Sequence, residues 1–118
     1  MTIDEYTQWA ASMPRPYDGS RAERLAYIGL GLAGEAGEVA DTIRRSMRDG
    51  TLEEERLAYE LGDLVYHWAC LCSEMGQLSS ALLAQSRQQI EHCLVGQRAK
   101  DELPLPPRGD QPRAPHLL

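Results

Sequence analysis

Apolar residues recur every three or four positions through most of the chain, which is the spacing of amphipathic helices. Four segments carry this pattern, over residues 3–13, 21–47, 52–75 and 80–96. No segment alternates apolar and polar residues in the way that a half-buried strand does. The pattern therefore predicts an all-α fold, a small antiparallel bundle of about four helices.

Local signals mark the expected ends of these helices. Capping boxes, in which serine or threonine is followed three residues later by glutamate, precede the first three helices. They begin at Thr2, Ser20 and Thr51. Gly50 and Gly76 are natural helix stops, and we expect Ser79 or Ser80 to cap the fourth helix.

The C-terminal stretch has a different composition, with five prolines between residues 104 and 115. Proline removes a backbone donor and clashes with the preceding helical turn. We therefore expect a helical domain over residues 1–98 and a Pro-rich, extended or disordered tail over residues 99–118. Because a chain of 118 residues can bury only a modest core, we also expect helix packing between copies, in a homodimer or a dimer of dimers.

Charge and apolar content exclude some classes of partner. The formal net charge of −6 argues against binding to a nucleic-acid polymer, which requires a basic surface. No apolar run approaches the ~18 residues of a membrane span, and the first nine residues do not resemble a signal peptide. Three cysteines without metal-ligand spacing fit free thiols in a reducing compartment. We expect a cytoplasmic protein without a membrane partner.

Two acidic pairs stand out inside the predicted second and third helices. Glu35 and Glu38 form one pair, Glu60 and Asp63 form the other, and 21 residues lie between Glu38 and Glu60. Carboxylates three residues apart project from one face of a helix. Crowded carboxylates need a counter-charge, and a divalent cation such as Mg²⁺ is the usual one.

Helical geometry predicts that the two pairs meet. At about 100° per residue, the first acid of each pair lies roughly 60° from its helix's apolar stripe and the second roughly 120°, in the same sense. The short connection at Gly50 makes the helices antiparallel neighbours. If the two apolar stripes face each other, acids with equal offsets from their stripes lie on the same side of the helix pair. Both pairs also lie roughly 15–22 Å from the turn, at ~1.5 Å per residue, so we expect the four carboxylates to converge.

The apolar stripes assumed in this geometry have six members each. They are Leu25, Ile28, Leu32, Ala36, Val39 and Ile43, then Leu57, Leu61, Leu64, Trp68, Cys72 and Met75. Simpler interpretations of the acids remain open, namely solvated helix faces or ion pairs with Arg45 and Arg56. His67, one turn beyond Asp63, either supports the acids or is only their partly buried neighbour.

Four glycines fall inside the predicted second helix, at positions 29, 31, 34 and 37. Each costs about 1 kcal/mol relative to alanine. Close approach of a ligand or a second backbone to the acidic face would explain them, as would contact between copies in a dimer. A weak helix is the remaining alternative.

The segments LGLAGEAGEVAD and ELGDLVYHWACL resemble the MazG-type nucleoside triphosphate pyrophosphohydrolases of the all-α NTP pyrophosphatase superfamily. That family carries an ExxE motif, a spacer and an ExxD motif, and the resemblance covers residues 3–76. It implies hydrolysis of a (d)NTP between the α- and β-phosphates, giving (d)NMP and pyrophosphate, with Mg²⁺ or Mn²⁺. Glu35, Glu38, Glu60 and Asp63 would hold the metal, and one of these carboxylates would help to generate the nucleophile.

Some positions depart from the family pattern. Gly34 stands where many members have a further acid, and Gln89 and His92 stand about where an Asn and a Lys are common. The substrate phosphates would then need other cations. Candidates are Arg45, Arg48, Arg87 and Arg113.

Each of these candidates has a simpler or less direct assignment. The first two also fit the C-terminal dipole of their helix, and Arg113 lies in an RGDQPR segment that resembles the tail of some members. Trp9, Tyr6 and Tyr27 either stack on a nucleobase or pack in the core or an interface.

Three functional hypotheses follow. The leading one is the hydrolase described above. A second is a non-catalytic helical module that binds a nucleotide or a protein, which the altered fourth helix would allow. A third is a purely structural helix-bundle dimer.

Overall fold

The computed structural model describes residues 1–15 and 17–102. Within these ranges the chain forms four α-helices and no strand, which confirms the predicted all-α class. They are α1 (Ile3–Ser12), α2 (Arg21–Asp49), α3 (Glu54–Glu74) and α4 (Ser79–Glu102). None of the described helices combines the length and apolarity that crossing a membrane requires.

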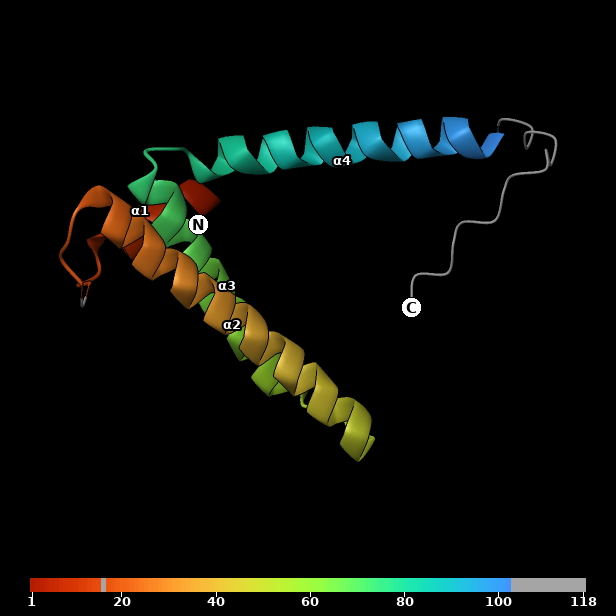
Figure 1. Cartoon of the computed structure of the whole chain (residues 1–118), viewed down its shortest axis with the longest axis horizontal. Helices are drawn as coiled ribbons and strands as arrows, with labels where there is room; N and C mark the ends of the chain where they lie inside the picture. The colour runs from red at the N-terminus through yellow and green to blue at the C-terminus, as the bar shows by residue number, and fades with distance from the viewer. Residues whose placement is uncertain (16, 103–118) are drawn as a thin grey trace, which may run out of the picture. The chain divides into compact units, whose positions relative to one another are not determined.

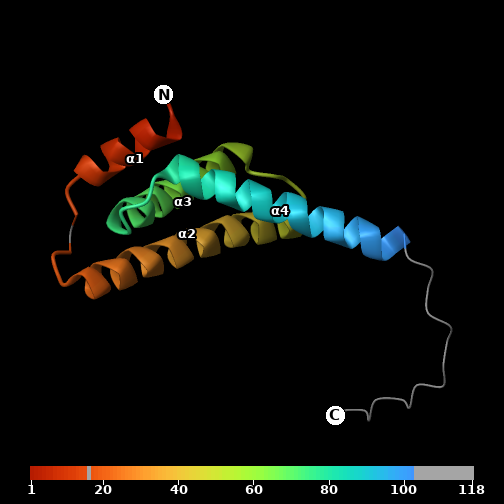
Figure 2. The ribbon, with the colours of Figure 1, turned by 90° about the horizontal axis from the view of Figure 1, so that it is seen from above.

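The chain divides into two compact units, Met1–Gln85 and Ser86–Leu118. In the first unit α3 is the central helix, since both α1 and α2 pack on it. Figures 1 and 2 show α2 and α3 running side by side as a long hairpin. The connection at Gly50 makes the two helices antiparallel, as expected.

Most helix ends follow the local signals. Thr2 and Glu5 form the complete capping box of α1, and the Ser20 hydroxyl accepts the Glu23 amide at the start of α2. Gly50 ends α2 with a positive φ of 73°, a conformation that favours glycine.

Two predicted caps are wrong, and in both places a tertiary contact replaces the local one. The box at Thr51 does not form, because α3 begins at Glu54 without a side-chain cap. Ser46 of α2 instead accepts the Glu53 amide at 3.4 Å. At α4, Asp4 of α1 accepts the Ser80 amide at 2.9 Å and also the Ser80 hydroxyl. These bonds lower the pKa of Asp4.

The core of the described residues is small. Its buried apolar members are Ala10, Ile28, Ala69, Cys70 and Cys72. Small side chains let α1 and α3 approach closely, with Tyr6, Tyr66, Trp68 and Leu71 packed around them. All three cysteines are free thiols, as expected.

In the second unit, α4 continues to Glu102 rather than stopping near Gly96. Its described side chains from residue 86 onward are exposed, and Arg87 pairs with Glu91 at 2.9 Å. The predicted tail falls mostly on residues 103–118, which lie outside the described ranges.

Glu74 joins three parts of the first unit. Its carboxylate accepts from Arg15 at 2.8 Å and from Arg24 at 2.6 Å, and its side chain is only 12% exposed. The segment after α1 and the start of α2 are thereby tied to the end of α3. The hydrogen bond from Arg24, reinforced by Arg15, lowers the pKa of Glu74 below its ordinary value.

Replacing Glu74 with glutamine should lower the free energy of unfolding at pH 7 by about 1–2 kcal/mol, because charged hydrogen bonds are lost. The depressed folded-state pKa stabilises the protein fully above the ordinary value of 4.5 and progressively less below it. The difference between wild type and Glu74→Gln should therefore shrink as the pH falls below 4.5. Urea denaturation, monitored by circular dichroism, measures this difference in the free energy of unfolding. Glu91→Gln is the control, since it breaks an exposed pair of little energetic value; equal losses in both variants would contradict the role of Glu74.

Candidate functional site

Four contacts fix the register of the α2–α3 hairpin. From the start of α2 to its end they pair Arg24 with Glu74, Gly31 with His67, Thr42 with Glu60 and Ser46 with Glu53. On α2, Glu35 and Glu38 lie between the second and third of these contacts, and on α3 Asp63 lies between the same two. The two acid pairs therefore occupy the same stretch of the hairpin, at the shared height that the sequence predicts.

The rotation of the two helices differs from the expectation. Thr42 and Glu60, which meet between the helices, are 1% and 7% exposed, whereas Ile43 and Leu61 of the predicted stripes are 43% and 45% exposed. The interface is thus rotated toward the acidic side relative to the expected packing of stripe against stripe, although other stripe residues such as Ile28, at 7% exposed, are buried. Absence of a side chain at Gly31 and the polar bond of Thr42 to Glu60 favour the observed interface.

Gly31 is where the two helices come closest to a clash. A Cβ atom at this position would lie 2.6 Å from the ring carbon Cδ2 of His67. Gly29, Gly34 and Gly37 have open space around them, so close approach explains one of the four glycines. Nδ1 of His67 lies 2.9 Å from the backbone carbonyl of Asp63, which fixes the ring against α2.

Glu60 is held at both carboxylate oxygens. The Thr42 hydroxyl donates to Oε2 at 2.5 Å, and Nε of Arg56 donates to Oε1 at 3.0 Å. The Thr42 bond is the larger cause, and Arg56 the smaller, of a pKa for Glu60 below its ordinary value, although burial opposes both. Glu60 is therefore ionised at neutral pH inside the helix interface.

The other three predicted acids have no protein partner at their carboxylates among the described residues. Glu35 and Asp63 are half-buried and Glu38 is exposed. Within residues 1–15 and 17–102, no three His, Cys, Asp or Glu side chains converge closely enough to hold a metal ion. Glu60 is turned toward Thr42 and Arg56 instead, and ionised carboxylates repel one another unless a positive charge bridges them. The donor set nevertheless fits Mg²⁺, since it consists of carboxylate oxygens.

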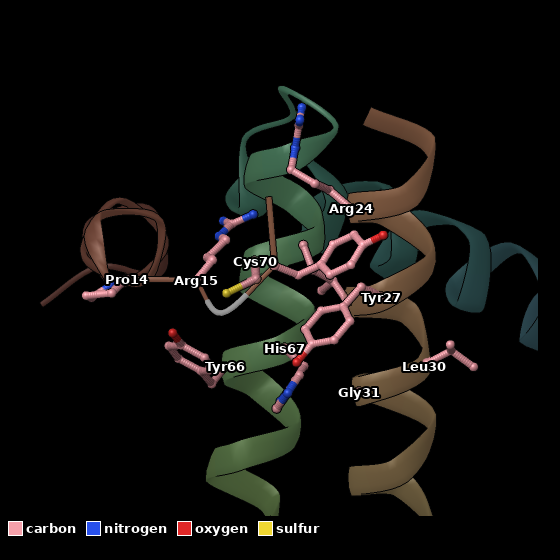
Figure 3. Close-up of a pocket in the computed structure, with 11 residues that line it drawn as sticks. Pro14, Arg15, Arg24, Tyr27, Leu30, Gly31, Tyr66, His67 and Cys70 are labelled. Carbon is pink, nitrogen blue, oxygen red and sulfur yellow. The ribbon is translucent and has the colours of Figure 1, made fainter. Parts of the chain in front are cut away.

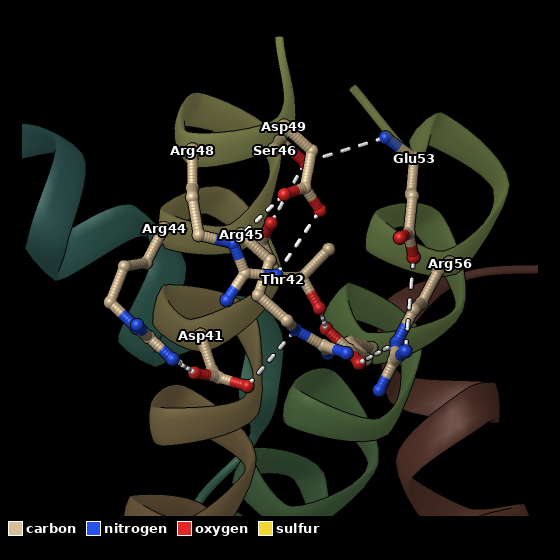
Figure 4. A network of polar contacts seen from close by, with 10 residues as sticks. Asp41, Thr42, Arg44, Arg45, Ser46, Arg48, Asp49, Glu53 and Arg56 are labelled. Atoms are coloured by element: carbon tan, nitrogen blue, oxygen red, sulfur yellow. Dashed lines mark hydrogen bonds and ion pairs between the residues drawn. The ribbon is translucent and has the colours of Figure 1, made fainter. Parts of the chain in front are cut away.

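Arginines and acids of α2 and α3 form a network of polar contacts around Thr42 (Figure 4). Nε of Arg45 lies 3.2 Å from Oδ2 of Asp41 but is buried without the geometry of a hydrogen bond. Arg44 binds Oδ1 of Asp41, and this bond lowers the pKa of Asp41. Of the predicted substrate arginines, Arg45 lies one helical turn from Thr42, and its charge is a minor cause of the lowered pKa of Glu60.

The structure does not place the other three predicted substrate arginines near Glu60. Arg48 pairs with Asp49 at 2.8 Å at the end of α2. Arg87 belongs to the second unit, and Arg113 lies outside the described residues.

Thr42 is the residue of this site that sequence reasoning missed. Its signal was present, because Thr42 and Ser46 put two hydroxyls four residues apart on the acidic side of α2. Nothing in the sequence shows that one of them faces Glu60 across the interface.

A cavity of about 360 Å³ lies between α2, α3 and the segment after α1 (Figure 3). Tyr17 and Tyr27 stack at its wall with ring centroids 5.1 Å apart. Gly31 and His67 also line it, and each is one helical turn from an acid, Glu35 or Asp63. The cavity is therefore an aromatic-walled space whose lining includes residues one helical turn from two of the acids.

The more polar part of this cavity lies at its other end. Arg15 and Arg24, both bound to Glu74, contribute to the lining, as does Cys70. Burial raises the pKa of the Cys70 thiol, so this cysteine is a protonated wall residue at neutral pH.

Comparison with known proteins agrees with the geometry. The family model described as the MazG nucleotide pyrophosphohydrolase domain matches residues 25–91, a stretch that contains both acid pairs. The chain is also 32% identical over 100 residues to the Gene 37 protein of Mycobacterium phage L5, covering 77% of this chain and 87% of that protein. No solved structure matches. The family match spans more than half of the chain, which therefore belongs to the MazG nucleotide pyrophosphohydrolase domain family.

Proposed function

We propose that the protein hydrolyses a nucleoside triphosphate, with ribose or deoxyribose, between its α- and β-phosphates. Water cleaves the anhydride bond and gives the nucleoside monophosphate, pyrophosphate and a proton. The observation that carries the proposal is the placement of both family acid pairs on the same stretch of the α2–α3 hairpin. Membership of the MazG family agrees with it.

In this proposal Glu35, Glu38, Glu60 and Asp63 hold Mg²⁺, for which Mn²⁺ can substitute. Three of the carboxylates have no partner among the described residues, and Glu60 is already ionised beside them. When bound, the cation offsets the charge of the phosphates and lowers the pKa of water. The carboxylates bind it, and one of them accepts the proton that water loses.

The nucleoside part fits the cavity next to the acids. Its aromatic wall, formed by Tyr17, Tyr27 and Tyr66, suits the flat face of a base. Arg45 is the proposed phosphate contact from the predicted set, because it lies one helical turn from Thr42 and its charge acts on Glu60.

The active form in this proposal is a homo-oligomer. Apolar side chains of both helices remain partly exposed on one side of the hairpin, among them Ile43, Leu61 and Met75. At about 100° per residue these positions lie roughly 70–90° from the α2–α3 interface, in the same sense on both helices. On antiparallel helices they form one continuous face, and a second copy would add the apolar burial that the small core lacks.

Glu38→Gln or Asp63→Asn should reduce pyrophosphate release about 100-fold or more, since each removes charge from the cation site. The assay screens canonical and damaged dNTPs and NTPs with and without Mg²⁺. Glu55→Gln is the matched control, because it removes an exposed acid from the first turn of α3 and should retain activity. Full turnover in both site variants would rule out the assignment of the acids. Nucleotide binding by wild type without any turnover would favour the non-catalytic module.

Tyr27→Ala should raise KM about tenfold with a smaller change in kcat, because an aromatic contact to a base contributes about 1–3 kcal/mol. Steady-state kinetics with the preferred nucleotide measures both constants. Tyr59→Ala, which removes a 74% exposed tyrosine from α3, should change neither constant. An unaltered KM in Tyr27→Ala would show that the base does not occupy the cavity.

Leu61→Glu should convert the oligomer into monomers, because a charge would be buried in the apolar face. Light scattering after size-exclusion chromatography gives the mass. Tyr59→Glu places the same charge on the opposite side of α3, roughly 160° away, and should leave the mass unchanged. Wild-type protein that is monomeric at micromolar concentration would contradict the proposed assembly.

A further inference from the structure

The two partners of Glu60 differ in how firmly they are held. Thr42 is 1% exposed, and its branched side chain has few rotamers available in a helix. The Arg56 side chain is 44% exposed and reaches the carboxylate on a long, flexible stem. One oxygen of Glu60 therefore has a fixed partner and the other a replaceable one.

Thr42 also uses its hydroxyl in an uncommon way for a helical threonine. The hydroxyls of Thr7 and Ser46 donate to the carbonyl four residues earlier in their own helices, which is the local bond expected in helices. The Thr42 hydroxyl instead donates across the interface to Oε2 of Glu60. Among the described residues, the carboxylate that the Thr42 hydroxyl contacts therefore belongs to Glu60, one of the proposed cation ligands.

Arg56 has a second carboxylate partner nearby, that of Glu53. Its Nη1 already lies 3.7 Å from Oε2 of Glu53, one turn earlier on α3. A divalent cation carries twice the charge of a guanidinium and competes for Oε1. Release of Arg56 from Glu60 leaves the arginine beside a second carboxylate at the protein surface.

We infer that Thr42 is a positioning residue of the cation site: its hydroxyl fixes Oε2 of Glu60, and Oε1 exchanges Arg56 for a divalent cation. The inference rests on the proposed function, because it takes Glu60 as a cation ligand. It adds two residues that the ExxE and ExxD pattern does not contain, one that supports cation binding and one that opposes it.

The test measures Mn²⁺ affinity by electron paramagnetic resonance in the absence of nucleotide. Thr42→Val keeps the shape but removes the donor, and should weaken Mn²⁺ binding about 10–100-fold, the range seen when a partner of a metal ligand is lost. Thr42→Ser keeps the hydroxyl and should restore most of the affinity. Ser46→Ala is the matched control, since it removes a neighbouring buried hydroxyl that does not contact Glu60. Urea denaturation of each variant separates lost affinity from lost stability.

Arg56→Gln provides a result of opposite sign from an exposed position, and urea denaturation checks that the variant is folded. Removing the competing guanidinium should tighten Mn²⁺ binding several-fold, whereas general damage to the site would weaken it. Equal affinities of wild type and a folded Thr42→Val would overturn the role of Thr42, and weaker binding by Arg56→Gln would overturn the exchange at Oε1. Wild-type protein that binds no Mn²⁺ would overturn the proposed cation site together with this inference. Mn²⁺ binding without pyrophosphate release would contradict the proposed hydrolysis and leave the inference supported by the affinities.

Discussion

A charged carboxylate inside the α2–α3 interface is the feature on which the arrangement of the site depends. Burying the Glu60 charge would be costly without hydrogen bonds, and Thr42 and Arg56 supply them from two helices. This requirement turns the polar side of α2 toward α3. The same rotation sets Glu35 and Glu38 against the stretch of α3 that carries Asp63. Glu60 is thus part of the helix interface, Glu35 and Asp63 are half-buried beside it, and Glu38 is exposed.

The rotation leaves apolar side chains of the hairpin partly exposed. Side chains such as Ile43 and Leu61, which a bundle would normally bury, remain partly in solvent. Small residues such as Ala10 and Ala69 form most of the closed core, so a single copy buries little apolar surface. The geometry that suits the carboxylates therefore leaves a face whose burial requires another surface, and the proposed second copy would supply it.

Positive charge is distributed at the two ends of the acidic stretch, and carboxylates already engage it. Glu74 binds Arg15 and Arg24 at one end, while Asp41 lies beside Arg44 and Arg45 at the other. Arg15, Arg24 and Arg44, which these carboxylates bind, offer limited charge to a triphosphate. Within the described residues, a cation held by the unpartnered carboxylates is the more effective source of positive charge for the proposed chemistry.

The sequence by itself determined the helical class, the hairpin and the common height of the two acid pairs, because helical period, capping residues and glycine stops are local properties. It also identified Arg56 as a possible partner of the acids, through its spacing on the helix. Only the tertiary structure decided which faces of α2 and α3 meet. That choice depends on contacts between residues far apart in the chain, such as Gly31 with His67 and Thr42 with Glu60. An apolar stripe predicts a buried face, but it does not predict which neighbour buries it.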